Sequence, residues 1–141
     1  MKVIPSGLIK HFEKTWEKRT GENVHDINYG WCYQFALILH RIHGNKVKLC
    51  TTYGHAWVEY DGKHYDSDFP RGTKTMPIPE SELPFSYVTP EQLAERWDTY
   101  GFSGEVRWDI INEVATIYLS PKKRPRIYNG IKAILRLKQR S

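Results

Sequence analysis

The clearest structural signal in the chain is a hairpin pattern over residues 54–68, which read Gly54-His55-Ala56-Trp57-Val58-Glu59-Tyr60-Asp61-Gly62-Lys63-His64-Tyr65-Asp66-Ser67-Asp68. Side chains in the first half alternate with a period of two, which is typical of a half-buried strand. Asp61-Gly62 is a dipeptide that favours a two-residue hairpin turn, because both turn positions need a positive φ. These residues therefore predict two antiparallel strands joined by a tight turn.

A further strand and the register of the hairpin follow from the same period. Residues 46–51 alternate in the same way, so we expect three antiparallel strands in all. With a two-residue turn, counting outward places Trp57 opposite Asp66 and His55 opposite Asp68. Both aspartates then share the face of His55, within reach of its side chain. A three-residue loop would send them to the other face.

The segments on either side of these strands carry helix patterns. Apolar residues recur at helical spacing over about residues 7–19, 31–42, 89–101 and 104–119. The expected helix boundaries are Ser6 as the first N-cap, Gly21 and Gly44-Asn45 as ends, Thr89-Pro90 as a start and Gly101 as an end. Residues 104–119 also suit two short strands, but the helix is favoured. The proline-rich residues 69–88 are expected to form a long surface loop.

The length of 141 residues is that of a single domain. Its charge is uneven: residues 121–141 hold eight Lys or Arg and no Asp or Glu, which leaves 13 basic and 16 acidic residues in 1–120. We therefore expect one folded domain over residues 1–120, followed by a basic amphipathic C-terminal segment over residues 121–141. That segment could bind an anionic partner, either nucleic acid or an acidic protein.

No run of residues approaches the roughly 20 apolar residues of a membrane span, and the opening residues lack a long apolar segment. We expect no transmembrane segment, no signal peptide and a cytoplasmic location. The two cysteines, Cys32 and Cys50, are too few for a disulfide framework and are expected to stay reduced. Cys50 has no helix start and no histidine motif beside it, so we expect it to be an unreactive core thiol.

Cys32 opens the second predicted helix, within Gly30-Trp31-Cys32-Tyr33-Gln34-Phe35-Ala36. A thiol in the first turn of a helix meets the positive end of the helix dipole, and an adjacent imidazolium stabilises the thiolate further. His55 is the candidate base. Such a base needs a third group that fixes its ring orientation, and either Asp66 or Asp68 can supply it.

These motifs resemble the core of transglutaminase-like cysteine enzymes, within the broad papain-like group. The resemblance covers about residues 28–70 and rests on Gly-Trp-Cys-Tyr-Gln-Phe-Ala, His-Ala-Trp-Val-Glu and Tyr-Asp-Ser-Asp. It implies an α+β fold in which the cysteine-bearing helix packs on a small antiparallel sheet. It also implies Cys32 as the nucleophile, His55 as general base and acid, and Asp66 or Asp68 as the orienting carboxylate.

Acyl transfer also needs hydrogen-bond donors for the developing oxyanion. The backbone N–H of Cys32 is the expected first donor, and the side-chain amide of Asn28 is the nearest candidate for the second. Trp31 and Trp57 are expected either to line a substrate groove beside the thiol or to pack around the small sheet.

The sequence therefore predicts thiol-dependent acyl transfer on a peptide, isopeptide or glutamine-type amide, with hydrolysis of a protein or peptide substrate favoured over transamidation. No metal or cofactor is expected, because the spacing of His55 and His64 is not that of zinc ligands. Two alternatives stay open. One is a binding module of the same fold without turnover, and the other is a protein that binds nucleic acid or an acidic surface through residues 121–141.

Overall fold

The computed structural model describes residues 1–52, 54–96 and 105–119, which form an α+β arrangement of helices on an antiparallel sheet. The predicted segment 121–141 and the helix end predicted at Gly101 lie outside the described residues. The elements in chain order are α1 (Leu8–Thr20), α2 (Cys32–His43), η1 (Gly44–Lys46), β1 (Lys48–Thr51), β2 (Ala56–Tyr60), β3 (Lys63–Tyr65), η2 (Glu80–Glu82), β4 (Ser86–Val88), α3 (Pro90–Ala94) and α4 (Trp108–Thr116).

The hairpin predicted from Asp61-Gly62 is confirmed. Both turn residues have a positive φ, 51° at Asp61 and 76° at Gly62. Glu59 lies opposite His64, as a two-residue turn requires. The local sequence thus sets the register of β2 against β3.

The ladder between β2 and β3 ends at the pair formed by Val58 and Tyr65. The cross-strand partners predicted for His55 and Trp57 lie beyond that pair. The contact between His55 and an aspartate therefore depends on the loop after β3 rather than on continued strand pairing.

The sheet has four strands in the order β3-β2-β1-β4. β1 is antiparallel to β2 on one side and to β4 on the other. The prediction of an unbroken loop over residues 69–88 is wrong at Ser86–Val88, which form β4. A three-residue edge strand is too short to show an alternating pattern, so it could not be predicted from periodicity.

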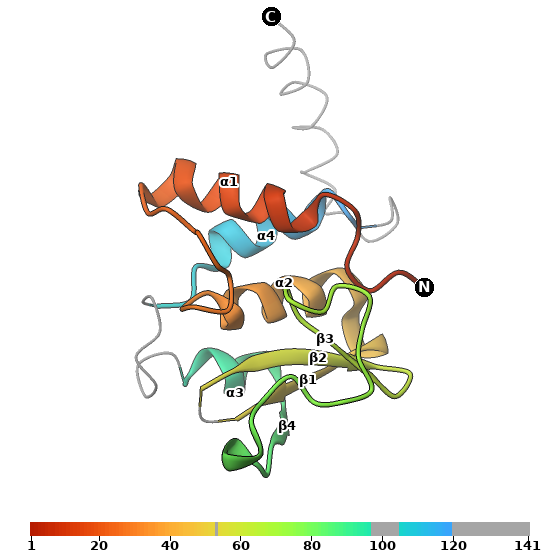
Figure 1. Ribbon diagram of the computed structural model, residues 1–141. Helices are drawn as coiled ribbons and strands as arrows, with labels where there is room; N and C mark the ends of the chain where they lie inside the picture. Colours follow the sequence, from red (N-terminus) through yellow and green to blue (C-terminus); the bar gives the residue numbers. More distant parts are fainter. Residues whose placement is uncertain (53, 97–104, 120–141) are drawn as a thin grey trace, which may run out of the picture.

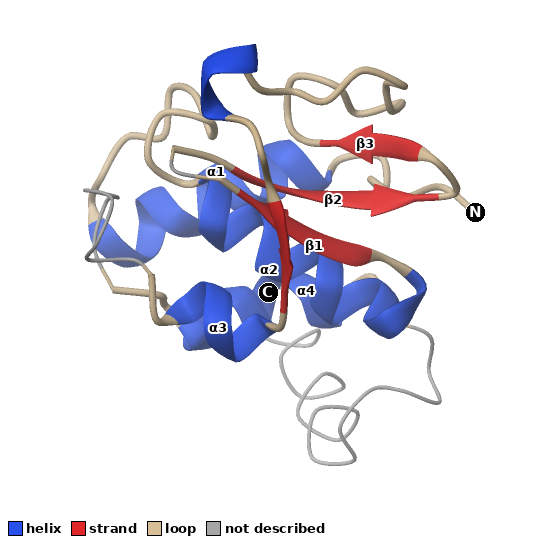
Figure 2. Ribbon diagram, turned by 90° about the horizontal axis from the view of Figure 1, so that it is seen from below, coloured by secondary structure: helices blue, strands red, loops and turns tan. Residues whose placement is uncertain are grey.

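The helices form two layers on one face of the sheet. Figure 1 shows α1 and α4 side by side, with α2 between them and the strands. Figure 2 shows the strands in front of α1, α2 and α4, while α3 follows β4 at the edge of the sheet. This order places the start of α2 close to the start of β2 (Figure 1).

The N-terminal boundary predicted for α1 is wrong. The helix begins after Gly7, which has a φ of 81°, and it has no side-chain cap. The hydroxyl of Ser6, the predicted cap, accepts a hydrogen bond from Lys2 at 2.7 Å instead. The predicted end is confirmed, because Gly21 adopts a φ of 80° and its N–H donates to the carbonyl of Glu17.

Other predicted helix boundaries agree with the structure, except that the helix predicted over residues 89–101 ends at Ala94, with Glu95 as its C-cap. α2 begins at Cys32 and ends before Gly44. Thr89 caps α3: its hydroxyl accepts from the N–H of Gln92 at 3.1 Å, and the Gln92 side chain accepts from the N–H of Thr89 at 2.9 Å. Residues 104–119 contain the helix α4 rather than two strands.

α2 is the central element of the core. It lies between the sheet and α4, so side chains around most of the helix are buried. The buried residues are Cys32, Tyr33, Gln34, Phe35, Ala36, Leu37, Ile38, Leu39 and Ile42. Although α2 is mostly apolar, no helix among residues 1–52, 54–96 and 105–119 is long and apolar enough to cross a bilayer. The packing on both sides fixes the position of the first residue of α2.

We predict that Ile110→Ala lowers the free energy of unfolding by about 2 to 5 kcal/mol, because it leaves a cavity between α4 and α2. Ile110 is fully buried, whereas Ile117, just after the same helix, is 46% exposed. Ile117→Ala is therefore the matched control and should change stability by about 0.5 kcal/mol or less. Urea unfolding of both variants measures the difference, and equal losses would contradict the proposed packing.

Candidate active site

A compact turn presents Cys32 at the start of α2. The N–H of Tyr29 donates to the carbonyl of Asp26, and the N–H of Trp31 donates to that of Ile27, both at 2.9 Å. Trp31 is the N-cap residue and provides no side-chain cap. The first N–H groups of a helix have no acceptor within the helix, so they place partial positive charge at the start of α2, where Cys32 lies.

His55 lies just before β2, and its backbone is held by the end of β1. The carbonyl of His55 accepts from the N–H of Thr52 at 3.0 Å and from the hydroxyl of Thr51 at 3.0 Å. The hydroxyl groups of Thr51 and Tyr33 are 3.2 Å apart, which ties this turn to α2. Thr51 could not be predicted from the sequence, because its role depends on a partner in another element.

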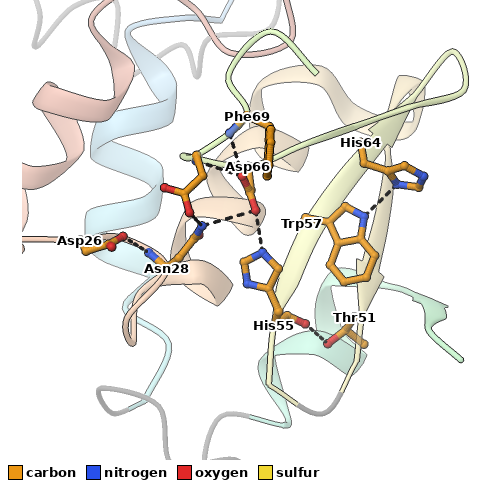
Figure 3. A network of polar contacts seen from close by, with 9 residues as sticks. Asp26, Asn28, Thr51, His55, Trp57, His64, Asp66 and Phe69 are labelled. Carbon is orange, nitrogen blue, oxygen red and sulfur yellow. Dashed lines mark hydrogen bonds and ion pairs between the residues drawn. The ribbon is translucent and has the colours of Figure 1, made fainter. Parts of the chain in front are cut away.

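The His55 ring is paired with Asp66 and not with Asp68. His55 Nε2 lies 2.8 Å from Asp66 Oδ2, and both side chains are buried. Asp66 Oδ1 accepts from the N–H groups of Asp68 and Phe69, each at 2.9 Å. Figure 3 shows the imidazole directed at Asp66 from below, with Phe69 above the carboxylate. Of the two predicted candidates, the geometry therefore assigns the contact with His55 to Asp66.

Asn28 contacts both aspartates. Its Nδ2 donates to Asp68 Oδ2 at 2.9 Å and to Asp66 Oδ2 at 3.4 Å. Its own N–H donates to Asp26 Oδ1 at 3.1 Å, which completes the turn before Cys32. In this arrangement both carboxylates accept hydrogen bonds from the amide of Asn28, the side chain predicted as the second oxyanion donor.

The surroundings of His55 act on its pKa in opposite directions. Burial favours the neutral ring and by itself lowers the pKa. The hydrogen bonds with Asp66 and Cys32, and the charges on both groups, outweigh burial and raise the pKa of His55 to about 9. The ring is therefore protonated at neutral pH and lies between a carboxylate and a thiol.

The two tryptophans pack behind the site. Trp57 stacks on the His55 ring, with the centroids 5.6 Å apart and the planes at 18°, and its Nε1 donates to His64 Nδ1 at 2.9 Å. Trp57 is 1% exposed and Trp31 is 6% exposed. Both rings are therefore buried, as the predicted packing around the small sheet requires.

Cys50, the second thiol, differs from Cys32 in position and in chemistry. It lies on β1 and is fully buried. Burial, and then the nearby charge of Glu59, raise the pKa of Cys50 to about 12. Its buried position in the sheet is the one predicted, and burial disfavours its thiolate form. Within the part of the chain that the structure describes, no three His, Cys, Asp or Glu side chains are grouped closely enough to hold a metal ion.

A cavity adjoins the turn that precedes His55. Its volume is about 670 Å³, and its lining includes Thr52, Gly54, Glu82 and Arg96. A Cβ at Gly54 would lie 2.8 Å from the Glu82 carboxylate, so glycine allows that carboxylate to approach the backbone. The cavity presents charged and hydroxyl groups close to the candidate base.

Comparisons of the chain with protein-family models, with curated proteins and with solved structures found no match in any of the three. The chemistry of the site is therefore argued from its own residues.

We predict that the free energy of unfolding falls as the pH rises from about 6.5 to about 9. The pKa of His55 is about 9 in the folded chain and 6.5 ordinarily, so in this range the folded state holds a proton that the unfolded state has released. The stabilisation is complete below pH 6.5 and is lost as the pH passes about 9, a change of about 3 kcal/mol. Urea unfolding at several pH values measures this loss.

The control for this prediction is Asp66→Asn, which removes the charge partner of His55 and should flatten the slope. Subtracting the pH dependence of the variant's free energy of unfolding from that of the native chain cancels the contributions of the other histidines. Among these, burial lowers the pKa of His11 and His40. Parallel curves for the two proteins would show that Asp66 does not hold His55 in its protonated form.

Proposed function

We propose that this protein is a cysteine enzyme that transfers acyl groups through Cys32, with hydrolysis of a peptide or isopeptide bond as its principal reaction. The observation that carries this proposal is the buried histidine bonded on one side to a carboxylate and on the other to a thiol. The resemblance of residues 28–70 to transglutaminase-like and papain-like enzymes adds support, because it implies Cys32 as the nucleophile, His55 as the base and either Asp66 or Asp68 as the orienting carboxylate.

The thiol and the imidazole form an activated pair in this proposal. Asp66 contacts His55 Nε2. The other ring nitrogen, Nδ1, is therefore the partner of the Cys32 thiol in this proposal. An imidazolium next to a thiol at a helix start favours the thiolate. In the proposed reaction Cys32 attacks as the thiolate, and the imidazolium beside it stabilises that charge.

The reaction follows from these positions. The Cys32 thiolate attacks the carbonyl carbon of the amide, and the negative charge moves to the carbonyl oxygen, where the N–H of Cys32 can donate. His55 gives its proton to the leaving nitrogen as the carbon–nitrogen bond breaks, which leaves a thioester on Cys32. Water then loses a proton to His55 and attacks the thioester, which releases the carboxylic acid and restores the thiol.

Asp66 keeps the imidazole in the orientation and charge state that both steps require. Its second oxygen is fixed by two backbone N–H groups, so it holds its position while the ring gains and loses a proton. Release of the acyl group to an amine instead of water would use the same residues and would make the protein a transamidase. Hydrolysis is the simpler reaction, because it needs no second substrate.

We predict that iodoacetamide alkylates Cys32 at neutral pH and that His55→Ala slows the reaction at about pH 7 by roughly thirtyfold. An unassisted thiol has a pKa of about 8.5 and is only a few per cent thiolate at that pH. Alkylation rates from about pH 4 to 9, located on each cysteine by mass spectrometry, measure the effect. The ratio of the two rates removes the influence of the low exposure of Cys32, which is 2%.

Cys50 is an internal control in the same sample. It is fully buried and its pKa is raised to about 12 by burial, so it should stay unmodified until the protein unfolds. Equal alkylation of Cys32 in the native chain and in His55→Ala would remove the basis of the proposed function.

A further inference from the structure

Two segments far apart in the sequence meet beside the proposed catalytic residues. One is the turn of residues 26–31, which leads directly into Cys32, and the other is the loop of residues 66–69, which carries Asp66. Asn28 extends from the first segment and donates to Asp66 and Asp68 in the second. Figure 3 shows Asn28 approaching the aspartate from the side opposite Trp57. The amide thus connects the position of the nucleophile with that of the orienting carboxylate.

The two contacts of Asn28 are unequal. The distance to Asp68 Oδ2 is 2.9 Å, whereas the distance to Asp66 Oδ2 is 3.4 Å. Asp68 is therefore the stronger anchor, since hydrogen bonds weaken at longer distances. Asp66 Oδ2 is also the atom that contacts His55 Nε2, so the weaker contact reaches the atom that holds the base.

The charge arrangement gives the amide a second effect. Asp66 and Asp68 place two carboxylates within reach of one side chain, and like charges at short range repel. Asn28 donates to both and carries no charge, so it reduces this repulsion without competing for the proton of His55. A carboxylate in its place would add a third negative charge.

Asn28 is itself oriented by the turn in which it lies. Its N–H donates to Asp26 Oδ1, and the carbonyl of Asp26 accepts from Tyr29, so the backbone around Asn28 is fixed on both sides. Because its backbone is fixed in the turn of residues 26–31 and its amide is bonded to Asp68, Asn28 keeps that turn and the loop of residues 66–69 in a set relative position.

We infer that Asn28 and Asp68 form an amide–carboxylate clamp that holds the start of α2 against the loop of Asp66 and so aligns Cys32 with His55. Both are positioning residues. The inference rests on the proposed function, and it gives Asp68 a role that the pairing of His55 with Asp66 leaves unassigned. An oxyanion donor at Asn28 would act on the reacting carbonyl alone, whereas the clamp acts on the histidine.

The test compares Asn28→Ala, Asp68→Ala and the double variant. Each single variant should slow alkylation of Cys32 at about pH 7 by about tenfold, as loss of a hydrogen bond to a charged group does. The double variant should be no slower than either single variant, because both remove the same contact. The titration of His55, followed by NMR, should shift below its native midpoint of about 9 in all three.

Two further variants separate alignment from loss of folding. Asp68→Asn keeps an acceptor oxygen for Asn28 and should recover most of the rate that Asp68→Ala loses. Tyr29→Ala changes the adjacent side chain, which is 76% exposed, and should leave both the rate and the titration as in the native chain. Circular dichroism and thermal unfolding establish that each variant is folded.

The outcomes distinguish the clamp from the proposed function. A native His55 titration in Asn28→Ala, or losses that add in the double variant, would overturn the clamp. If alkylation of the native chain does not depend on His55, the proposed function fails instead. The His55 titration in the Asn28 and Asp68 variants still decides whether the clamp exists, because it does not require a reactive thiol.

Discussion

The buried contact between His55 and Asp66 is the interaction on which the arrangement of the site depends. It joins the entry of β2 to the loop after β3, and its 2.8 Å distance is possible only if both segments keep their positions. Burial alone would leave the ring neutral. The carboxylate and the thiol reverse that preference and raise the pKa of His55 to about 9. A positive ring at neutral pH is thus a product of the fold rather than of the histidine itself.

Separate sets of contacts hold His55, Asp66 and Cys32 in place. The hydroxyl of Thr51 fixes the backbone of His55, and Trp57 stacks against its ring. The N–H groups of Asp68 and Phe69 hold the other oxygen of Asp66. α2 is packed between the sheet and α4, which fixes Cys32 from behind. Because each support comes from a different element, the site requires the complete core and cannot be formed by the hairpin alone.

Local signals in the sequence predicted the elements, whereas contacts between distant residues decided the details. Asp61-Gly62 specifies its turn through two adjacent residues, so the register of the hairpin was predictable. The choice between Asp66 and Asp68 was not, because β3 ends at Tyr65 and Asp66 turns back to accept from the backbone that follows it. Such side-chain to backbone bonds compete with strand pairing. The orientation of Asn28 depends on the same loop, because its amide donates to Asp66 and Asp68. Its nearness to Cys32 in the sequence could not predict these contacts.

The energetics of a buried ion pair argue that stability alone does not explain why His55 and Asp66, rather than apolar side chains, occupy this part of the core. Removing two charges from water is costly, and apolar side chains of similar volume often stabilise a core as well or better. This chain already has such a core: Val58 and Ile110 are fully buried beside α2 and need no charge to pack. A carboxylate, a protonated histidine and a thiol at the junction of that core with the turn before α2 therefore call for a chemical explanation. The proposed nucleophilic catalysis would supply one, since it uses an imidazolium that stabilises the thiolate and a carboxylate that orients the ring.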